Sequence, residues 1–347
     1  MRTFVLVATL LSLALIPATL RAPVLAQEAP SPGAPPPATD AAAPPEEESS
    51  TQTLNVNVNL VNLYFSAYDK NGFVTNLVKS DCVVAEDKVP QTIKNFTQEK
   101  NLPLTIGILL DTSGSQTNVL PLEKESGATF LRDVLTPKDE AFLISFDINV
   151  DLLSDYTNRA SEISRAMNKA QINTGATYGS VTGNGAPRGT LLFDAVYLAA
   201  HDKLSMEAGR KILVLLTDGG DQGSQETLKT ATEAAQKANA IVYVILIADR
   251  AFYGGGNFNL GDTGAREMQQ LASDTGGRVI NVGHDGKKLE DAFNQIQDEL
   301  RTQYLLSYTP TNAKADGTFR KIYLNCGKLK IQTRTGYYAI SAADAGN

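Results

Sequence analysis

The sequence has no tryptophan, only two histidines and only two cysteines among 347 residues, and its basic residues never form a run longer than two. A basic patch is therefore missing, and the formal net charge is −7. Binding to nucleic-acid phosphates needs clustered Lys and Arg side chains. The composition consequently argues against a nucleic-acid partner.

The sequence also lacks the short motifs of several large enzyme classes. It contains no G-x-S-x-G elbow, no G-x-G-x-x-G fingerprint and no G-x-x-x-x-G-K-[ST] loop. His201 and His284, the only histidines, do not stand beside a candidate nucleophile. Hydrolase, dinucleotide-binding and nucleotide-triphosphatase functions therefore lose their main support.

No apolar run near the N-terminus is long enough to span a bilayer, because Pro17 and Arg21 interrupt it. Together with the Val24-x-Ala26 pattern before Gln27, this predicts a cleaved secretory signal peptide over residues 1–26. A retained membrane anchor is the alternative. We expect a secreted or periplasmic protein of the cell envelope, with no integral membrane span after cleavage.

The segment 27–52 consists mainly of Pro, Ala, Ser and Glu and offers little apolar surface to bury. Such a composition cannot offset the entropy cost of ordering the chain, so a disordered linker is predicted. After export, a disulfide between Cys82 and Cys326 is chemically permitted, and two buried free thiols are the alternative.

Short apolar runs alternate with amphipathic stretches over residues 103–303, which is typical of an α/β domain with a mostly parallel, Rossmann-like sheet between helices. The patterns predict buried strands at 104–110, 141–146, 212–217 and 241–247, an edge strand at 277–282 and an antiparallel strand at 149–155. They predict helices at 120–135, 190–204, 225–239, 265–275 and 287–304.

The flanks 53–102 and 304–341 change to a period of two, which is typical of β-strands, and a tail of residues 342–347 follows. The alternation slips at Val61, which predicts a bulge. Each flank is too small to be stable alone. We therefore expect the flanks to pair into one small β-sandwich-like unit, with the α/β domain inserted between them.

Five oxygen-bearing side chains fall at loops that follow predicted strands or open a predicted helix. Because the carboxyl ends of parallel strands meet at one edge of a sheet, we expect these side chains to converge there. Hydroxyl and carboxylate oxygens without His or Cys favour a hard cation, Mg²⁺ first and Mn²⁺ or Ca²⁺ next. The predicted metal ligands are Asp111, Ser113, Ser115, Thr190 and Asp218.

Only two of these five ligands are acids, so a bound divalent ion is incompletely neutralised and keeps an open coordination position. An external carboxylate suits such a position. We therefore hypothesise that a Glu or Asp of a partner protein completes the coordination sphere and gives metal-dependent adhesion.

The motifs Asp111-x-Ser113-x-Ser115, Gly189-Thr190 and Leu216-Thr217-Asp218-Gly219 resemble the von Willebrand factor type A domain. The resemblance implies a metal-ion-dependent adhesion site in which the two serines, Thr190 and Asp218 contact the ion directly or through water. Asp111 would be mainly water-linked. The flanking motifs DKNG and QYLLSYTP resemble exported acidobacterial members, although Cys82 stands where an aromatic residue is expected.

An enzymatic alternative is a Mg²⁺-dependent phosphatase-like domain with Asp111 as the nucleophile and Asp218 with Asp221 as metal ligands. It resembles the haloacid dehalogenase pattern, which requires a second acid where Ser113 stands. No Lys is placed to hold the phosphate intermediate. We therefore expect a non-enzymatic protein, and interpret Asp221 as the cap of the following helix.

A third interpretation is a structural module of the cell envelope, in which a metal only stabilises loops. Metal-dependent binding of an acidic partner would separate it from the adhesion hypothesis. The loop 174–189 is rich in glycine and would lie at the edge of the sheet that carries the metal. Its Tyr178, Asn184 and Arg188 could contact the partner, or the loop could be flexible filler.

Overall fold

The computed structural model describes residues 60–99, 102–172, 189–247 and 260–340. The predicted signal peptide, the linker 27–52 and the side chains of Tyr178, Asn184 and Arg188 lie outside these ranges. Among the described residues, no helix combines the length and the apolar character needed to cross a membrane.

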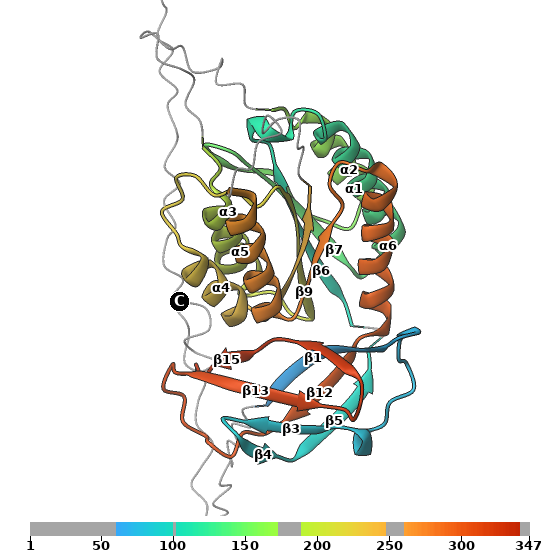
Figure 1. Ribbon diagram of the computed structural model, residues 1–347, viewed down its shortest axis with the longest axis vertical. Helices are drawn as coiled ribbons and strands as arrows, with labels where there is room; N and C mark the ends of the chain where they lie inside the picture. Colours follow the sequence, from blue (N-terminus) through green and yellow to red (C-terminus); the bar gives the residue numbers. More distant parts are fainter. Residues whose placement is uncertain (1–59, 100–101, 173–188, 248–259, 341–347) are drawn as a thin grey trace, which may run out of the picture. The chain divides into compact units, whose positions relative to one another are not determined.

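A six-stranded sheet forms the centre of the α/β domain (Figure 1). Five strands are parallel, and only the edge strand β8 runs antiparallel to its neighbour. All six predicted strands are confirmed, with β11 and β8 at the two edges. In spatial order the strands are β11 (Val279–Asn281), β10 (Ala240–Leu246), β9 (Arg210–Thr217), β6 (Leu104–Asp111), β7 (Glu140–Phe146) and β8 (Val150–Thr157).

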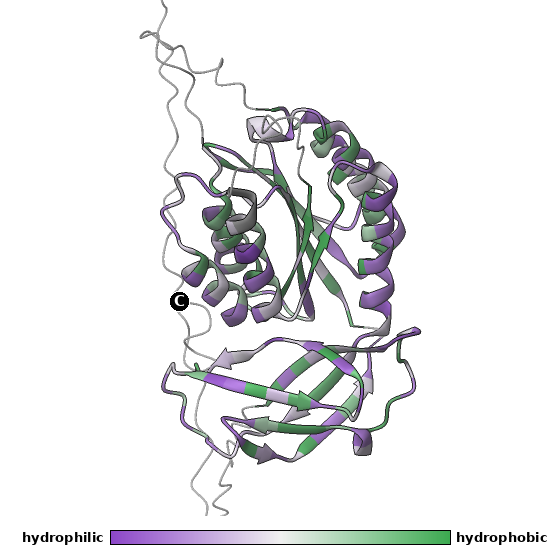
Figure 2. Cartoon of the chain, in the orientation of Figure 1, coloured by the Kyte–Doolittle hydropathy of each residue, from purple (hydrophilic) through white to green (hydrophobic). Residues whose placement is uncertain are grey.

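Three of the four inner strands of the sheet are buried along their whole length, because helices cover both faces. Every residue of β6, β9 and β10 is buried. Figure 2 shows these strands as largely hydrophobic, whereas the helices around them alternate between hydrophobic and hydrophilic sides. This is the expected pattern for parallel strands inside an α/β domain.

Two layers of helices cover the sheet (Figure 1). One layer packs on the face that carries Ile106 and Ile108, and the other packs on the face that carries Leu109 and Phe142. The first layer contains α1 (Leu120–Val134), α2 (Ala160–Lys169) and α6 (Gly286–Thr302), and the second contains α3 (Leu192–Leu198), α4 (Leu228–Lys237) and α5 (Leu260–Thr275).

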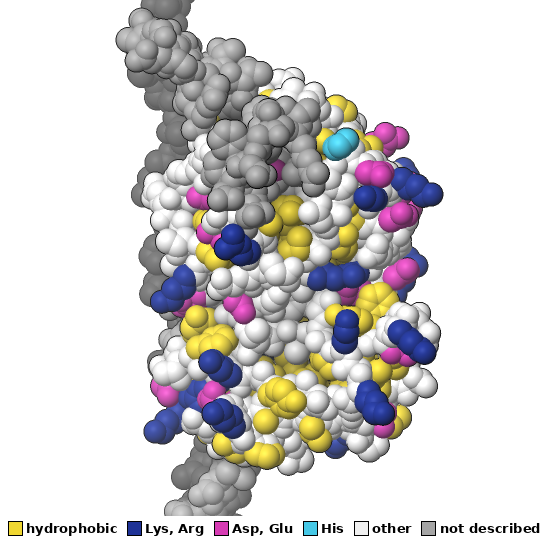
Figure 3. All heavy atoms as spheres, in the orientation of Figure 1, with side chains coloured by type: hydrophobic (Ala, Val, Ile, Leu, Met, Phe, Trp, Pro, Cys, Tyr) yellow, Lys and Arg dark blue, Asp and Glu magenta, His cyan; other side chains and the backbone are white. Residues whose placement is uncertain are grey.

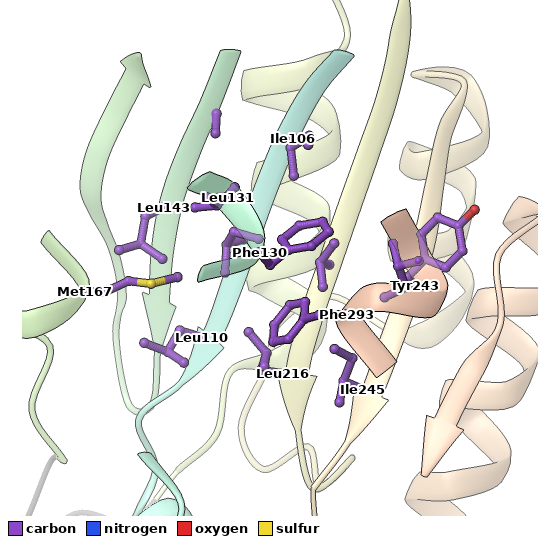
Figure 4. Close-up of a cluster of buried hydrophobic side chains, with 14 of the residues drawn as sticks. Ile106, Leu110, Phe130, Leu131, Leu143, Met167, Leu216, Tyr243, Ile245 and Phe293 are labelled. Carbon is purple, nitrogen blue, oxygen red and sulfur yellow. The ribbon is translucent and has the colours of Figure 1, made fainter. Parts of the chain in front are cut away.

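The core under the first layer is built from large side chains of helices and strands together. Phe130 of α1 stacks on Phe293 of α6 with ring centroids 4.9 Å apart. Figure 4 shows this pair among the aliphatic side chains of the sheet, including Leu110 and Leu216. These contacts fix α1 and α6 on the same face of the sheet.

Helix α2 and the starts of α3, α4 and α5 differ from the sequence prediction. Helix α4 begins at Leu228 rather than at residue 225, and α5 begins at Leu260 rather than at residue 265. Helix α2 was not predicted, although its buried Ile163, Ala166 and Met167 follow helical spacing. Helix α3 begins at Leu192 rather than at Thr190, because the Thr190 backbone forms a β-bridge with Gln222. The helical course continues after α3 as a π-helical segment, Ala199–Leu204.

The two flanks form a pair of antiparallel sheets, and each sheet combines strands from both flanks. Side chains of both sheets share one hydrophobic core, as predicted for a sandwich-like unit. One sheet has the order β14 (Lys330–Thr333), β1 (Val61–Asp69), β12 (Tyr304–Tyr308) and β5 (Ile93–Gln98), with β2 (Gly72–Phe73) paired to β1. The other has the order β15 (Gly336–Tyr338), β13 (Phe319–Asn325), β3 (Val83–Glu86) and β4 (Val89–Gln91).

Local contacts hold the flank strands in register. Asp87 and Lys88 turn the β3–β4 hairpin with φ values of 46° and 71°, as a tight primed turn requires. A disulfide joins Cys82 to Cys326 at the adjacent ends of β3 and β13, across 244 positions of sequence. The residues before Leu60, on which the predicted bulge near Val61 depends, lie outside the described ranges.

Candidate metal centre

The carboxyl ends of β6 and β9 bring the two predicted acidic ligands to one edge of the sheet. The strands are parallel neighbours, and Leu110 is paired with Leu216. Asp111 is therefore level with Thr217, and the Thr217 hydroxyl donates a hydrogen bond of 2.7 Å to Asp111 Oδ2. Asp218 follows directly on the same loop.

The loop after β6 turns the two serine hydroxyls toward each other. The Ser113 backbone N–H donates to Asp111 Oδ1 at 2.9 Å. The Ser113 and Ser115 hydroxyl oxygens lie 3.1 Å apart. A short 3₁₀ turn, Gly114–Gln116, closes this loop. Three of the five predicted ligands thus form one local cluster.

Thr190 is held beside the loop that carries Asp218. Its backbone N–H donates to Gln222 O at 3.0 Å, and the Gln222 N–H donates back to Thr190 O at 2.9 Å. The next residue, Leu191, donates its N–H to the carbonyl of Asp147, which follows β7. The segment that opens α3 is therefore hydrogen-bonded to the loop after β9 and to the loop after β7.

Two supporting side chains at this edge were not singled out from the sequence. The Thr217 hydroxyl accepts the Gly219 N–H at 3.0 Å in addition to its bond to Asp111. The Thr112 hydroxyl donates to Asp147 Oδ2 at 2.8 Å. Position at the end of a buried strand was the available signal for both. These contacts hold the loops after β6 and β9, in which Thr112 and Thr217 stand directly beside predicted ligands.

The prediction that Asp221 caps the following helix is wrong. Helix α4 is capped by Thr227, whose side chain accepts the Thr230 N–H. Asp221 Oδ1 instead accepts the Phe193 N–H at 3.3 Å and the Ser224 hydroxyl at 2.6 Å. The acid therefore ties the loop after β9 to the first turn of α3, because α4 begins later than the pattern indicated.

The electrostatic environment of Asp111 disfavours a negative charge. Asp111 is fully buried. Burial, and then the negative charge of Asp218, raise the pKa of Asp111 to about 7, although hydrogen bonds from Ser113 and Thr217 oppose the shift. A positive ion between the two carboxylates would relieve both effects.

We expect the metal-free protein to lose stability as the pH rises from about 4 to about 7. The pKa of an Asp side chain in an unfolded chain is about 3.9, whereas the pKa of Asp111 in the folded chain is about 7. Within that window the folded protein holds a proton that the unfolded chain has released, so raising the pH favours unfolding. The Asp111 contribution is on the order of 4 kcal/mol.

Urea denaturation in EDTA at pH 4.5 and pH 7.5 measures this effect. Asp111→Asn removes the titrating group, so its free energy of unfolding should decline less than that of the wild type. The difference between the two proteins isolates Asp111 from the other carboxyl groups. An identical pH dependence in both proteins would contradict the prediction.

The donor set fits a hard divalent cation. Two carboxylates and the serine hydroxyls supply oxygen, and neither histidine lies in the loops that carry them. The described ranges contain no group of three or more His, Cys, Asp and Glu side chains arranged to hold an ion. A cation here would therefore depend on the hydroxyl groups as well as on the two acids.

Solved structures with a similar fold are only distantly related in sequence. BatB from Bacteroides thetaiotaomicron is 16% identical, with a TM-score of 0.43 and coverage of 56% of this chain and 98% of that one. The vWF domain of the type V pili tip protein Mfa5 from Porphyromonas gingivalis is 13% identical, with a TM-score of 0.42 and coverage of 57% and 94%.

Proximal thread matrix protein 1 from the mussel byssus has a structure with a zinc-occupied MIDAS motif. It is 15% identical, with a TM-score of 0.44, and the match covers 62% of this chain and 49% of that one. No curated protein matches the chain.

The family model described as the von Willebrand factor type A domain matches residues 106–295, more than half of the chain. The match begins within β6 and ends within α6, so it includes nearly all of the central sheet and of its two helical layers. The chain belongs to the von Willebrand factor type A domain family.

Proposed function

We propose that the chain is an exported protein-binding module of the adhesion type. In this proposal five side chains hold a divalent cation, and an acidic residue of a partner protein completes its coordination. The arrangement of the loops after β6 and β9 carries the proposal, because it joins Asp111 to Thr217 and brings two serine hydroxyls within 3.1 Å. The proposed ligands are Asp111, Ser113, Ser115, Thr190 and Asp218.

Each part of the site would have a distinct role. The buried Asp111 is held by hydrogen bonds from Ser113 and Thr217. It would therefore keep one position and act on the ion mainly through a bound water molecule. The less buried Asp218 and the hydroxyl groups would contact the ion. Mg²⁺ fits this donor set best, with Mn²⁺ and Ca²⁺ as alternatives. Bound there, the cation would supply a Lewis-acidic position for a carboxylate.

The remainder of the chain fits an extracytoplasmic binding module. We propose residues 1–26 as a cleaved signal peptide, 27–52 as a linker, and the flank strands as a base that carries the domain. On the face in Figure 3, Lys and Arg side chains are scattered among acidic and uncharged side chains. That distribution favours a protein partner over a polyanion, and we propose no enzymatic activity.

Calorimetric titration with Mg²⁺ and Mn²⁺, with and without acetate, tests the proposal. We expect one saturable site, and acetate should bind only in the presence of the metal, because the cation provides its binding position. Ser113→Ala should weaken metal binding at least about tenfold, which corresponds to about 1.4 kcal/mol. Ser161→Ala, on the exposed side of α2, is the matched control and should leave binding unchanged.

Absence of metal binding to the wild type would contradict the proposal and leave a structural module. Metal binding without any effect on acetate would contradict the bridging step alone.

A further inference from the structure

Glu123 is a buried acid with no assigned role. It lies in the first turn of α1, and its side chain is 0% exposed. Neither carboxylate oxygen has a hydrogen-bond partner among the described residues. An ionised carboxylate in such a position is costly unless a positive charge or hydrogen-bond donors compensate it.

The backbone connects Glu123 directly to the loop that carries the serines. The Gln116 N–H donates to Ser113 O, the Val119 N–H donates to Gln116 O, and the Glu123 N–H donates to Val119 O. Gln116 is also buried, and both polar atoms of its side chain lack a partner within the described ranges. Two unsatisfied polar side chains therefore lie in the turn and helix that follow the serine loop.

The charges around Glu123 are those of the metal centre. Burial, and then the negative charges of Asp111 and Asp218, raise its pKa well above the ordinary value. No Lys or Arg of the described residues is among the groups that shift it. Because these acids are close enough to act on Glu123, a cation that they bind would also act on it.

Glu123 does not act as a direct ligand in this geometry, because the described residues include no group of three acids placed to hold an ion. Its influence would be exerted through charge and through the water molecules of a hydrated cation. Mg²⁺ commonly keeps several waters when proteins bind it. The amide of Gln116 can both donate and accept hydrogen bonds in such a layer.

Building on the proposed function, we propose that Glu123 is a third acid of the metal centre, which stabilises the hydrated cation from inside the fold. With Asp111 and Asp218 it sets three negative charges against the two positive charges of the ion. The interior charge then strengthens metal binding. It also weakens the attraction for a carboxylate that approaches from outside, so Glu123 limits the affinity for an acidic partner.

The test compares Glu123→Gln with Glu125→Gln in the full chain. The second variant removes the same charge from an exposed position of the same helix. Free Mn²⁺ is measured by electron paramagnetic resonance during titration. Acetate binding to the Mn²⁺-free, Mg²⁺-saturated protein is followed by chemical-shift changes in nitrogen-15 NMR spectra. Thermal unfolding in EDTA shows that each variant is folded.

We expect Glu123→Gln to weaken Mn²⁺ binding at least about tenfold and to strengthen acetate binding at saturating Mg²⁺ by at least about threefold. Glu125→Gln should change neither affinity by more than about twofold, because solvent screens an exposed charge. A purely structural role would not move the two affinities in opposite directions.

Unchanged Mn²⁺ affinity in Glu123→Gln, with normal binding by the wild type, would overturn the role of Glu123 and leave the proposed function intact. Weaker binding of both Mn²⁺ and acetate would also overturn it. If the wild type binds no Mn²⁺, the proposed metal centre itself is refuted.

Discussion

Replacement of Asp111 by asparagine is expected to lower the Mg²⁺ affinity at least about 100-fold, which corresponds to about 2.7 kcal/mol. The change keeps the size of the side chain and an oxygen that can accept the Ser113 N–H, but it removes a charge inside the protein. Asp111 is fully buried beside Asp218, so the attraction between its carboxylate and a cation is weakly screened by solvent.

The same substitution should stabilise the metal-free protein at pH 7.5. It removes the repulsion between Asp111 and Asp218 and the cost of burying a carboxylate. Opposite effects on metal affinity and on metal-free stability would identify a site whose charges are arranged for a cation rather than for folding.

Calorimetry with Mg²⁺ and urea denaturation in EDTA provide the two measurements. Asp151→Asn changes the net charge equally at an exposed position of β8, and should affect neither quantity appreciably. Retention of wild-type Mg²⁺ affinity by Asp111→Asn would show that this carboxylate is not part of a metal site.

Replacement of Glu299 by alanine is expected to lower the free energy of unfolding by about 3–5 kcal/mol, the typical cost of breaking a buried ion pair. Glu299 belongs to α6 and is 0% exposed. Its Oε2 lies 3.0 Å from Arg278 Nε. Removal of the carboxylate would leave this guanidinium without its charge partner in a largely buried position.

Glu299 Oε1 accepts three hydrogen bonds, and two of them join the α/β domain to the flank strands. The donors are the Tyr243 hydroxyl of β10 at 2.8 Å, the Ser66 hydroxyl of β1 at 3.2 Å and the Gln332 amide of β14 at 2.6 Å. Glu299→Ala would remove the acceptor of the buried Tyr243 and Ser66 hydroxyls, and each unsatisfied buried donor adds to the loss. The Gln332 amide would keep its second acceptor, the Gly276 carbonyl at 3.2 Å.

Thermal and urea unfolding of Glu299→Ala test this prediction, with Glu290→Ala as the control because that glutamate is exposed on the same helix. We expect the control to remain within about 0.5 kcal/mol of the wild type. A comparably small effect of Glu299→Ala would contradict the proposed contribution of the network. Metal affinity should be unchanged in both variants, because neither residue lies in the serine loop.

The architecture was predictable from the sequence because burial on both faces leaves a strong signal. The apolar runs that became β6, β9 and β10 are long and contain few charges. Helix α2 was missed because it is short and carries few apolar residues, although its spacing is helical. Its stability comes from packing against α1 and the sheet, which a local pattern does not contain.

The candidate ligands could be located from the sequence because they immediately follow strands or open a helix. The bond from Thr217 to Asp111 depends on which strands are neighbours, and that order is a property of the fold. The pairing of Cys82 with Cys326 likewise required the register of β3 and β13. Sequence separation alone left the disulfide and two free thiols as equal alternatives.

Glu123 could have been recognised from helical periodicity. It stands three residues after buried Leu120, four before buried Gly127 and seven before buried Phe130. An acid in phase with the buried face of an amphipathic helix is unusual enough to indicate a special role. Its relation to Asp111 and Asp218 became evident only from the three-dimensional arrangement.

Anomalous X-ray diffraction from crystals of the protein containing Mn²⁺ tests the central claim most directly. We predict one strong anomalous peak between the hydroxyl oxygens of Ser113, Ser115 and Thr190, with the carboxylates of Asp111 and Asp218 bound to the ion directly or through water. Peaks only at other positions, or no peak at a saturating Mn²⁺ concentration, would contradict the proposed metal centre.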